Sequence, residues 1–291
     1  MQLDRTKVAI RERSLLEISD LALHVVRRFS PTLLIMLAVG VIPMALLNRF
    51  LLGWMVDDLT GWTFARYAWN MVLLIFIEAP LATAAATMFL GDAMFLQPPT
   101  LRQVLANLSK LSGRLFICQG LLRGVLPAWV LVVTMSPDVP MPGDFLIPML
   151  VFYLLFMRAL RPYVNEIILL ERNPLRAKSP RAITVGRRSS KLHSPNGGDL
   201  FGRYLGVIFV TCLLSMIVLF GMWFTVGTVF NDWSWGVMMI HVVFPAALWT
   251  VAGYMCVVRY LAYLDLRTRR EGWAVELHMR AEANRLQKQV F

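Results

Sequence analysis

Long apolar stretches separated by short polar connections dominate the pattern of hydrophobic and polar positions along this chain. A bilayer core is about 30 Å thick, and a helix needs about 20 residues to cross it. Six stretches reach this length, at residues 31–56, 67–94, 114–135, 145–170, 204–230 and 235–261. The pattern predicts an all-α integral membrane protein with six transmembrane helices, and it leaves no room for a soluble catalytic domain of the usual ~100 residues.

Composition supports this prediction. The 291 residues are 57% hydrophobic and only 16% charged, whereas soluble domains are about 25% charged. Cys118, Cys212 and Cys256 lie inside apolar stretches at no metal or redox spacing, so we interpret them as small core residues. The charged N-terminal segment that precedes the first apolar run does not match a cleavable signal peptide.

The formal charge of +11 is distributed unevenly. Lys and Arg gather before the first stretch, between the second and third, between the fourth and fifth, and after the sixth, which predicts that both termini are cytoplasmic. Anionic lipid headgroups are the expected partners of these cations, and nucleic acid is not. Four tryptophans near the predicted outer ends fit an interfacial belt, namely Trp54, Trp62, Trp233 and Trp235.

The chain divides into three parts on this basis. Residues 1–30 form a cytoplasmic amphipathic segment, residues 31–263 a membrane domain with a cytoplasmic loop at about 171–203, and residues 264–291 a basic cytoplasmic helix. Arg28, Arg114 and Arg203 each close a mixed apolar and basic segment, at a spacing of about ninety residues. This spacing is compatible with a threefold repeat of surface helix plus transmembrane hairpin, and equally with any six-span protein that keeps positive loops inside.

The surface segments differ in their expected structure. Leucines and Val104 recur at helical spacing over residues 101–115, which predicts an amphipathic helix in the inner interface. In the third surface segment, which ends at Arg203, Pro195 and the Asn196 to Gly198 run predict a longer, partly irregular loop.

Charged residues inside the apolar stretches need an explanation, because an unpaired charge in the bilayer is costly. From helix rise, Glu78 lies about 16 Å from the outer start of its helix, and Arg123 lies about 13 Å from the inner start of the next. We therefore expect a Glu78 to Arg123 ion pair, with Arg158 within snorkelling reach. The pair would fix helix register or, in the alternative interpretation, belong to a transport pathway.

A second polar group lies near the end of the fourth stretch. Arg161, Asn165 and Glu166 fall within about two turns of helix, and Pro162 can kink that helix. They form a candidate inner-interface site for a headgroup or ligand, or a solvated helix exit. The histidines have no metal-ligand spacing, and phosphate-loop and hydrolase motifs are missing from the sequence, so we expect no metal, no cofactor and no enzymatic activity.

The most distinctive motif follows the sixth stretch. It consists of Tyr263, Asp265, Arg267, Arg269, Arg270, Glu271 and Gly272. This juxtamembrane motif resembles the Tyr-x-Asp-x-Arg-x-Arg-Arg-Glu-Gly pattern of bacterial six-span proteins related to the membrane domain of glycerophosphoryl diester phosphodiesterases. Further matches to that family are Pro162, Glu166, Ala182, Arg188 and Ser189. The phosphodiesterase domain itself is missing, so the resemblance implies an accessory role rather than hydrolysis.

Three functional hypotheses follow. The leading one is a non-enzymatic accessory or scaffold subunit of the bacterial inner membrane that assembles other membrane proteins, or copies of itself, through its basic face. The alternative is a transporter or channel that uses Glu78, Arg123 and Arg158. A lipid-modifying enzyme using Asp57, Asp58 and Arg66 is third, because no nucleophile and base accompany these residues.

Overall fold

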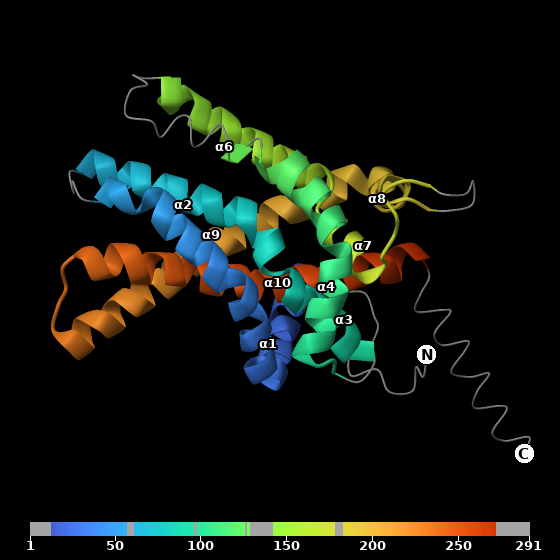
Figure 1. The fold of residues 1–291 in the computed structure, drawn as a ribbon, viewed down its shortest axis with the longest axis horizontal. Helices are drawn as coiled ribbons and strands as arrows, with labels where there is room; N and C mark the ends of the chain where they lie inside the picture. Colours follow the sequence, from blue (N-terminus) through green and yellow to red (C-terminus); the bar gives the residue numbers. More distant parts are fainter. Residues whose placement is uncertain are drawn as a thin grey trace, which may run out of the picture.

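The computed structural model describes residues 13–56, 61–95, 98–125, 127–128, 142–177 and 183–271. All regular secondary structure within these ranges is helical, which confirms the all-α prediction (Figure 1). The helices are α1 (Leu15–Leu52), α2 (Gly61–Ala82), α3 (Ala84–Phe95), α4 (Leu101–Leu115), α6 (Pro142–Leu160), α7 (Val164–Leu170), α8 (Val185–His193), α9 (Gly197–Phe230) and α10 (Phe244–Glu271). Two π-helical segments, Phe116–Val125 and Met239–Val243, and two 3-10 turns, Gly53–Val56 and Ser194–Asn196, join them.

Four helical stretches in the described part of the chain are long and apolar enough to cross a membrane. They are Leu15–Met55, Phe64–Met94, Gly197–Phe230 and Met239–Arg270. This finding supports a multi-pass membrane protein. The stretch expected at 114–135 lies partly outside the described residues, and the stretch expected at 145–170 is two helices, because the backbone leaves the helical path at residues 161–163, where Pro162 lies.

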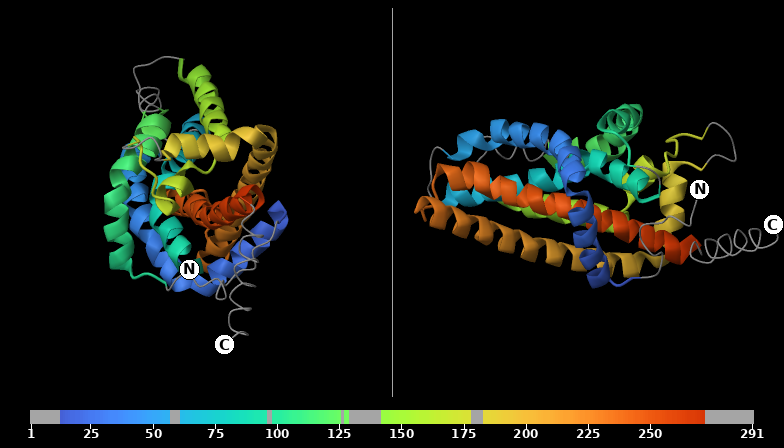
Figure 2. Two further views of the ribbon diagram at one scale, coloured as in Figure 1. Left: turned by 90° about the vertical axis from the view of Figure 1, so that its right-hand side faces the viewer. Right: turned by 90° about the horizontal axis from the view of Figure 1, so that it is seen from below.

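Helix α1 is longer than a bilayer is thick. Its 38 residues correspond to about 57 Å of helix. Ser14 caps its first turn in a capping box with Glu17, and Pro31 and Pro43 lie inside it. Figures 1 and 2 show that the helix is bent, so its first turns run across α10 while its second half runs beside α2. The boundary expected at residue 30 therefore lies within one continuous helix.

Helix α10 is the central element of the bundle, because it packs against α1, α2, α3, α8 and α9. The chain turns between α9 and α10 at the left of Figure 1, and α8 and the last turns of α10 lie at the right. We call the first of these the aromatic end, because Trp223 packs there against Trp233 and Trp235, with ring centroids 5.3 and 6.5 Å apart. We call the other the polar end. Helix α10 continues without a break through the boundary expected at residue 263.

Two hydrophobic clusters fill the interior. One joins α3, α7 and the C-terminal half of α10 to the first half of α1. The other lies nearer the aromatic end and joins α2 and α6 to the second half of α1. Between the two clusters, α1 and α2 approach so closely that a Cβ at Gly40 would lie 2.0 Å from the carbonyl oxygen of Ala82. The lack of a side chain at Gly40 therefore allows α1 to pack closely on α2 at Ala82.

The surface segments agree only partly with expectation. Helix α4 forms as predicted, is capped by Thr100, and buries Val104, Leu111 and Leu115. The third segment is more regular than expected, because α8 is followed by a single 3-10 turn and α9 already begins at Gly197. The two glycines expected to interrupt helical structure are thus the first residues of a helix of 34 residues.

Candidate functional site

An ionic network occupies the polar end of the bundle. We use this name for the carboxylates of Glu166, Glu171 and Asp265 together with their arginine partners Arg188, Arg203, Arg259, Arg267 and Arg269. The carboxylates come from α7, the residue after α7, and α10, and the arginines come from α8, α9 and α10. The network therefore ties four separate segments to one another.

Glu171 is the most highly connected carboxylate. Arg188 donates two hydrogen bonds to it, from Nε at 2.5 Å and from Nη2 at 2.7 Å, and the Tyr263 hydroxyl donates a third at 2.6 Å. Asn173 Nδ2 donates a fourth at 2.9 Å. Burial alone raises the pKa of Glu171, but the hydrogen bonds from Arg188 and Tyr263 hold its pKa below the usual range. The bidentate geometry is the one in which Arg binds carboxylate most specifically.

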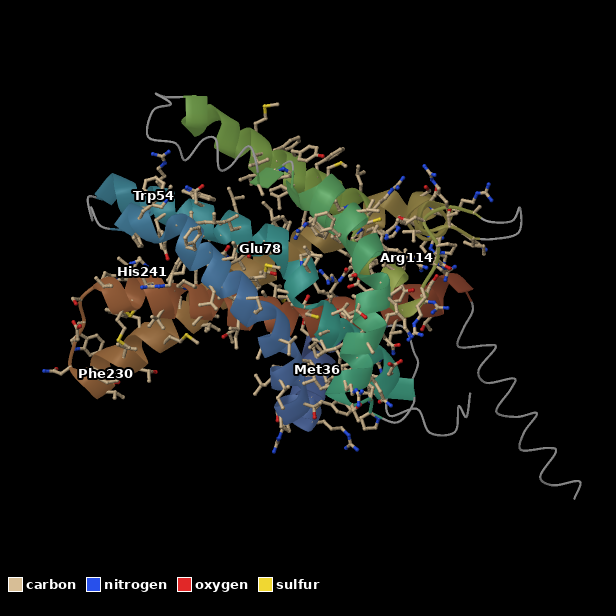
Figure 3. All side chains as sticks on the ribbon, viewed as in Figure 1. Met36, Trp54, Glu78, Arg114, Phe230 and His241 are labelled. Carbon is tan, nitrogen blue, oxygen red and sulfur yellow. The ribbon has the colours of Figure 1, made fainter. Side chains whose placement is uncertain are left out.

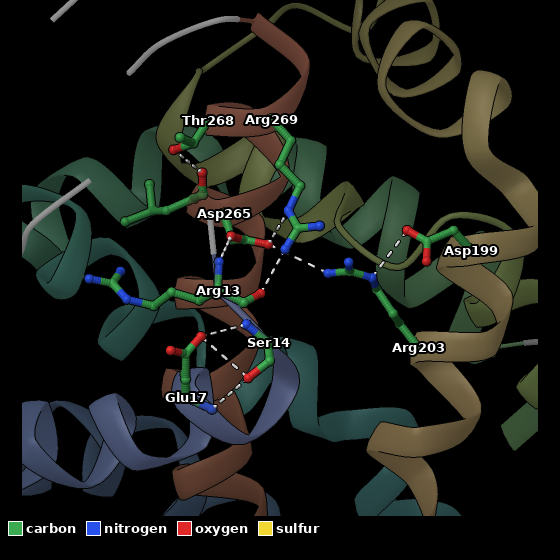
Figure 4. A network of polar contacts seen from close by, with 9 residues as sticks. Arg13, Ser14, Glu17, Asp199, Arg203, Asp265, Thr268 and Arg269 are labelled. Atoms are coloured by element: carbon green, nitrogen blue, oxygen red, sulfur yellow. Dashed lines mark hydrogen bonds and ion pairs between the residues drawn. The ribbon is translucent and has the colours of Figure 1, made fainter. Parts of the chain in front are cut away.

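Asp265 joins the ends of the described chain (Figure 4). Its side chain is 3% exposed and pairs with Arg269 at 2.9 Å and with Arg203 at 3.5 Å. The backbone N–H of Arg13 donates to it at 2.8 Å, and Arg269 Nη2 donates to the Arg13 carbonyl at 2.7 Å. Arg203 also pairs with Asp199 at 3.1 Å. Asp265 thus fixes the segment before α1, the start of α9 and the end of α10 in one arrangement.

Glu166 lies deeper in the bundle. Its side chain is fully buried, and its Oε1 pairs with Arg259 Nε at 2.5 Å. Its neighbour Asn165 donates from Nδ2 to the Pro80 carbonyl at 3.1 Å. The inner-interface site predicted from Arg161, Asn165 and Glu166 is therefore divided, because Asn165 and Glu166 are buried packing residues and only Arg161 is exposed.

The juxtamembrane motif contributes most of its residues to the network. Tyr263, Asp265, Arg267 and Arg269 contact Glu171 or one another, and Arg270 and Glu271 complete the last turn of α10. Gly272 and Ala182 lie outside the described residues. Of the additional family matches, Glu166 and Arg188 are in the network, while Ser189 contacts His193.

The ion pair expected between Glu78 and Arg123 is not formed. Glu78 Oε2 accepts a hydrogen bond from Asn48 Nδ2 at 2.9 Å, and among the described residues no ion pair joins it to an arginine. Both Asn48 and Glu78 are buried, and Glu78 lies between the long helices in Figure 3. The depth estimate placed the residues at one level but gave no information on direction around each helix, and α2 turns Glu78 toward α1.

The two predicted intramembrane arginines bind backbone carbonyls instead. Arg158 Nη2 donates to the Ile77 carbonyl at 3.1 Å, and its guanidinium lies over the Phe76 ring at 3.9 Å. Arg123 Nη1 donates to the Arg161 carbonyl at 3.0 Å. Arg158 thus contacts the residue before Glu78 in the chain, but on a different side of α2.

Several network residues were missed by reasoning from the sequence. Arg259 lies inside the stretch 235–261, so the criterion that identified Glu78 also applies to it. Glu171 gave no such signal, because it follows the apolar stretch and looks like an ordinary exposed helix exit. Asp57 and Asp58, proposed for a lipid-modifying site, lie outside the described residues.

The chemistry of the network is that of a fixed structural contact. Each of its carboxylates is paired with at least one arginine. Buried carboxylates paired in this way define geometry at the cost of desolvation.

Comparisons of the chain with protein families, with curated proteins and with solved structures found no match.

Proposed function

We propose that this protein is a non-enzymatic accessory or scaffold subunit of the bacterial inner membrane. In this proposal the chain has six membrane spans, and the polar end with both termini faces the cytoplasm. The likeness of the juxtamembrane motif to the six-span family related to the phosphodiesterase membrane domain belongs to this proposal. The ionic network is the observation that carries it, because a surface built from several segments must be rigid to bind a partner reproducibly.

Helix α8 supplies the surface that would meet a partner. Its buried face carries Arg188, which pairs with Glu171, and its outer face presents the exposed cations Arg187 and Lys191 one turn apart. The network therefore holds a basic patch in a fixed position at the polar end. An acidic surface on a neighbouring protein, or on another copy of the chain, would fit this patch.

Helix α9 supports placement in a membrane. None of its most apolar 18-residue window is buried within the molecule. Large side chains such as Phe209, Met216 and Phe220 are more than half exposed. Lipid or a membrane partner must cover this surface, because soluble proteins rarely expose so large an apolar patch.

The transport alternative rests on polar groups in the interior. Glu78 is 8% exposed and bound to Asn48, which is itself 1% exposed. A carboxylate packed in this way resembles a helix-helix contact more than the wall of a water-filled path. The scaffold proposal is therefore preferred over the transporter.

Partner capture tests the proposal. The full chain would be extracted from its native membrane in mild detergent and purified, in parallel with two double variants, Arg187→Ser with Lys191→Ser on α8, and Arg102→Gln with Lys110→Gln on α4. We expect the wild type and the α4 variant to retain a stable protein partner and the α8 variant to lose it. A strictly monomeric wild-type protein would contradict the proposal.

A further inference from the structure

Four arginines come together where α6 and α7 meet α2. We call Arg123, Arg158, Arg161 and Arg259 the arginine cluster. They come from the π-helical segment, the end of α6, the break after α6, and α10. Arg158 binds the Ile77 carbonyl, and a Cβ at Gly124, beside Arg123, would lie 3.2 Å from Ile77 Cγ2. Ile77 of α2 is thus the common neighbour of two of these arginine segments.

The members of the cluster act on one another electrostatically. Arg158 interacts electrostatically with Arg123 and with Arg259. The phenol of Tyr204 on α9 interacts electrostatically with all three of these arginines. Arg123 also interacts electrostatically with Arg161, and it donates a hydrogen bond to the Arg161 backbone carbonyl. Four cations are therefore concentrated in one part of the bundle.

Within the described part of the chain, negative charge does not balance this concentration. Glu166 is bound to Arg259 at 2.5 Å and can offset one of the four. Glu78, the other carboxylate in this region of α2, points to Asn48 instead. Uncompensated charges in a medium of low dielectric are costly, so this excess favours an anion.

The cluster also presents unused hydrogen-bond donors. Arg158 Nε, Arg259 Nη2 and the Tyr204 hydroxyl are buried and have no hydrogen-bond partner among the described residues. The guanidinium and the phenol are donors that match a phosphate group, with Arg giving planar, charge-assisted contacts. The segment that carries Arg123 is a π-helix, a rare conformation that is frequent at functional sites.

We propose that the arginine cluster and Tyr204 bind a phosphate-type anion, either the headgroup of an anionic phospholipid or a free phosphate. Arg161 is exposed, and Arg123, Arg158 and Tyr204 are half-buried, so the cluster reaches the surface of the molecule. Arg158 lies at the end of α6 and Tyr204 near the start of α9. These two helices pack against each other, and α9 is the least buried of the four candidate membrane spans. A headgroup from the surrounding bilayer could therefore reach the cluster laterally. This site does not depend on the scaffold role.

Thermal denaturation of the full chain tests the site in two arms. In the first, detergent-solubilised protein is titrated with inorganic phosphate against sodium chloride of equal ionic strength. In the second, protein in phosphatidylcholine nanodiscs is compared with protein in nanodiscs that also contain phosphatidylglycerol. Stabilisation in the first arm identifies free phosphate as the ligand, and stabilisation in the second arm alone identifies the lipid headgroup.

Variants assign the effect to residues. Arg158→Met should weaken the phosphate or lipid response about tenfold or more, since it removes a charge-assisted hydrogen bond. Tyr204→Phe keeps the ring and removes one donor, so it reports on the site even if Arg158→Met fails to fold. Arg102→Gln removes an exposed arginine on α4 and should leave the response unchanged. The proposal is overturned if neither arm shows stabilisation, if Tyr204→Phe responds like the wild type, or if Arg102→Gln loses the response equally.

Discussion

The ionic network and the arginine cluster use the same residue type in opposite ways. In the network, Arg188, Arg203, Arg259, Arg267 and Arg269 share the three carboxylates Glu166, Glu171 and Asp265. In the arginine cluster, Arg123 and Arg158 donate to backbone carbonyls and have no carboxylate partner among the described residues. Arg259 belongs to both, and Glu166 is where the two regions meet. The difference separates arginines that fix the fold from arginines with capacity to bind an anion.

The largest effect is expected from breaking the bidentate pair. Arg188→Met removes two charge-assisted hydrogen bonds from the half-buried Glu171 and should lower the free energy of unfolding by about 3–5 kcal/mol. Thermal denaturation in mild detergent measures this, and Arg187→Met, an exposed neighbour, is the matched control. The double variant Glu171→Gln with Arg188→Met should recover part of the loss, because no unpaired charge remains. Equal stability of the two arginine variants would contradict a structural role for the network.

A smaller effect is expected at Tyr263. Tyr263→Phe removes a hydrogen bond to the charged Glu171 carboxylate and should cost about 1.5–3 kcal/mol. Tyr254→Phe removes a bond of similar length to the neutral Ser19 carbonyl and should cost about 0.5–1.5 kcal/mol. The same denaturation assay compares the two. If Tyr254→Phe is the more destabilising, charge at Glu171 does not strengthen the polar end as described.

Replacement of Glu78 distinguishes the two interior interpretations. Glu78→Gln keeps an oxygen that can accept from Asn48, so we expect a change in stability under about 1 kcal/mol. Glu78→Ala leaves the buried Asn48 amide without this acceptor and should cost about 1–3 kcal/mol. Liposome flux measured on the same proteins completes the test. Transport that depends on the Glu78 carboxylate would favour the transporter.

The smallest effect is a pH dependence at His193. Burial lowers the pKa of His193, and the cations Arg123 and Arg161 lower it further, against the hydrogen bond to the Ser189 carbonyl. Its Nε2 accepts from the Tyr163 N–H at 3.4 Å, which requires the neutral ring. Because the folded state disfavours protonation, the stability from His193 is present above the ordinary histidine pKa of about 6.5 and is lost as the pH falls below it.

A comparison of denaturation at neutral and mildly acidic pH measures this dependence. His193→Gln should reduce the loss of stability on acidification, and His24→Gln, on the exposed face of α1, should not. An unchanged pH dependence in His193→Gln would show that another group titrates.

The sequence was sufficient to predict features that depend on the length of an apolar stretch or on the helical spacing of apolar residues. Four of the six apolar stretches coincide with long apolar helices, the spacing of Val104 and Leu111 predicted α4, and Pro162 marked the break after α6. It was also sufficient to identify the juxtamembrane motif as distinctive. These features follow from local chemistry along one segment.

Which side chains contact one another between different helices could not be predicted in the same way. The depth of Glu78 in its helix was estimated, but the contact with Asn48 depends on how α1 and α2 are rotated, which is decided by close packing at Gly40 and Ala82. The pairing of Glu171 with Arg188 depends on the path of the chain between α7 and α8. Such tertiary contacts join separate segments of the chain. The spacing of apolar residues along the sequence does not specify how these segments are oriented relative to one another.

The central claim is that the polar end, with its ionic network and basic α8 face, lies in the cytoplasm. Side-specific cysteine labelling tests it most directly. In a chain without Cys118, Cys212 and Cys256, a single cysteine would replace Ser190 on α8 or Ser234 at the aromatic end, both of which are exposed. With a membrane-impermeant reagent on cells with a permeabilised outer membrane, we predict labelling at position 234 and protection at position 190 until the inner membrane is opened. Labelling of position 190 in cells with an intact inner membrane would contradict the claim.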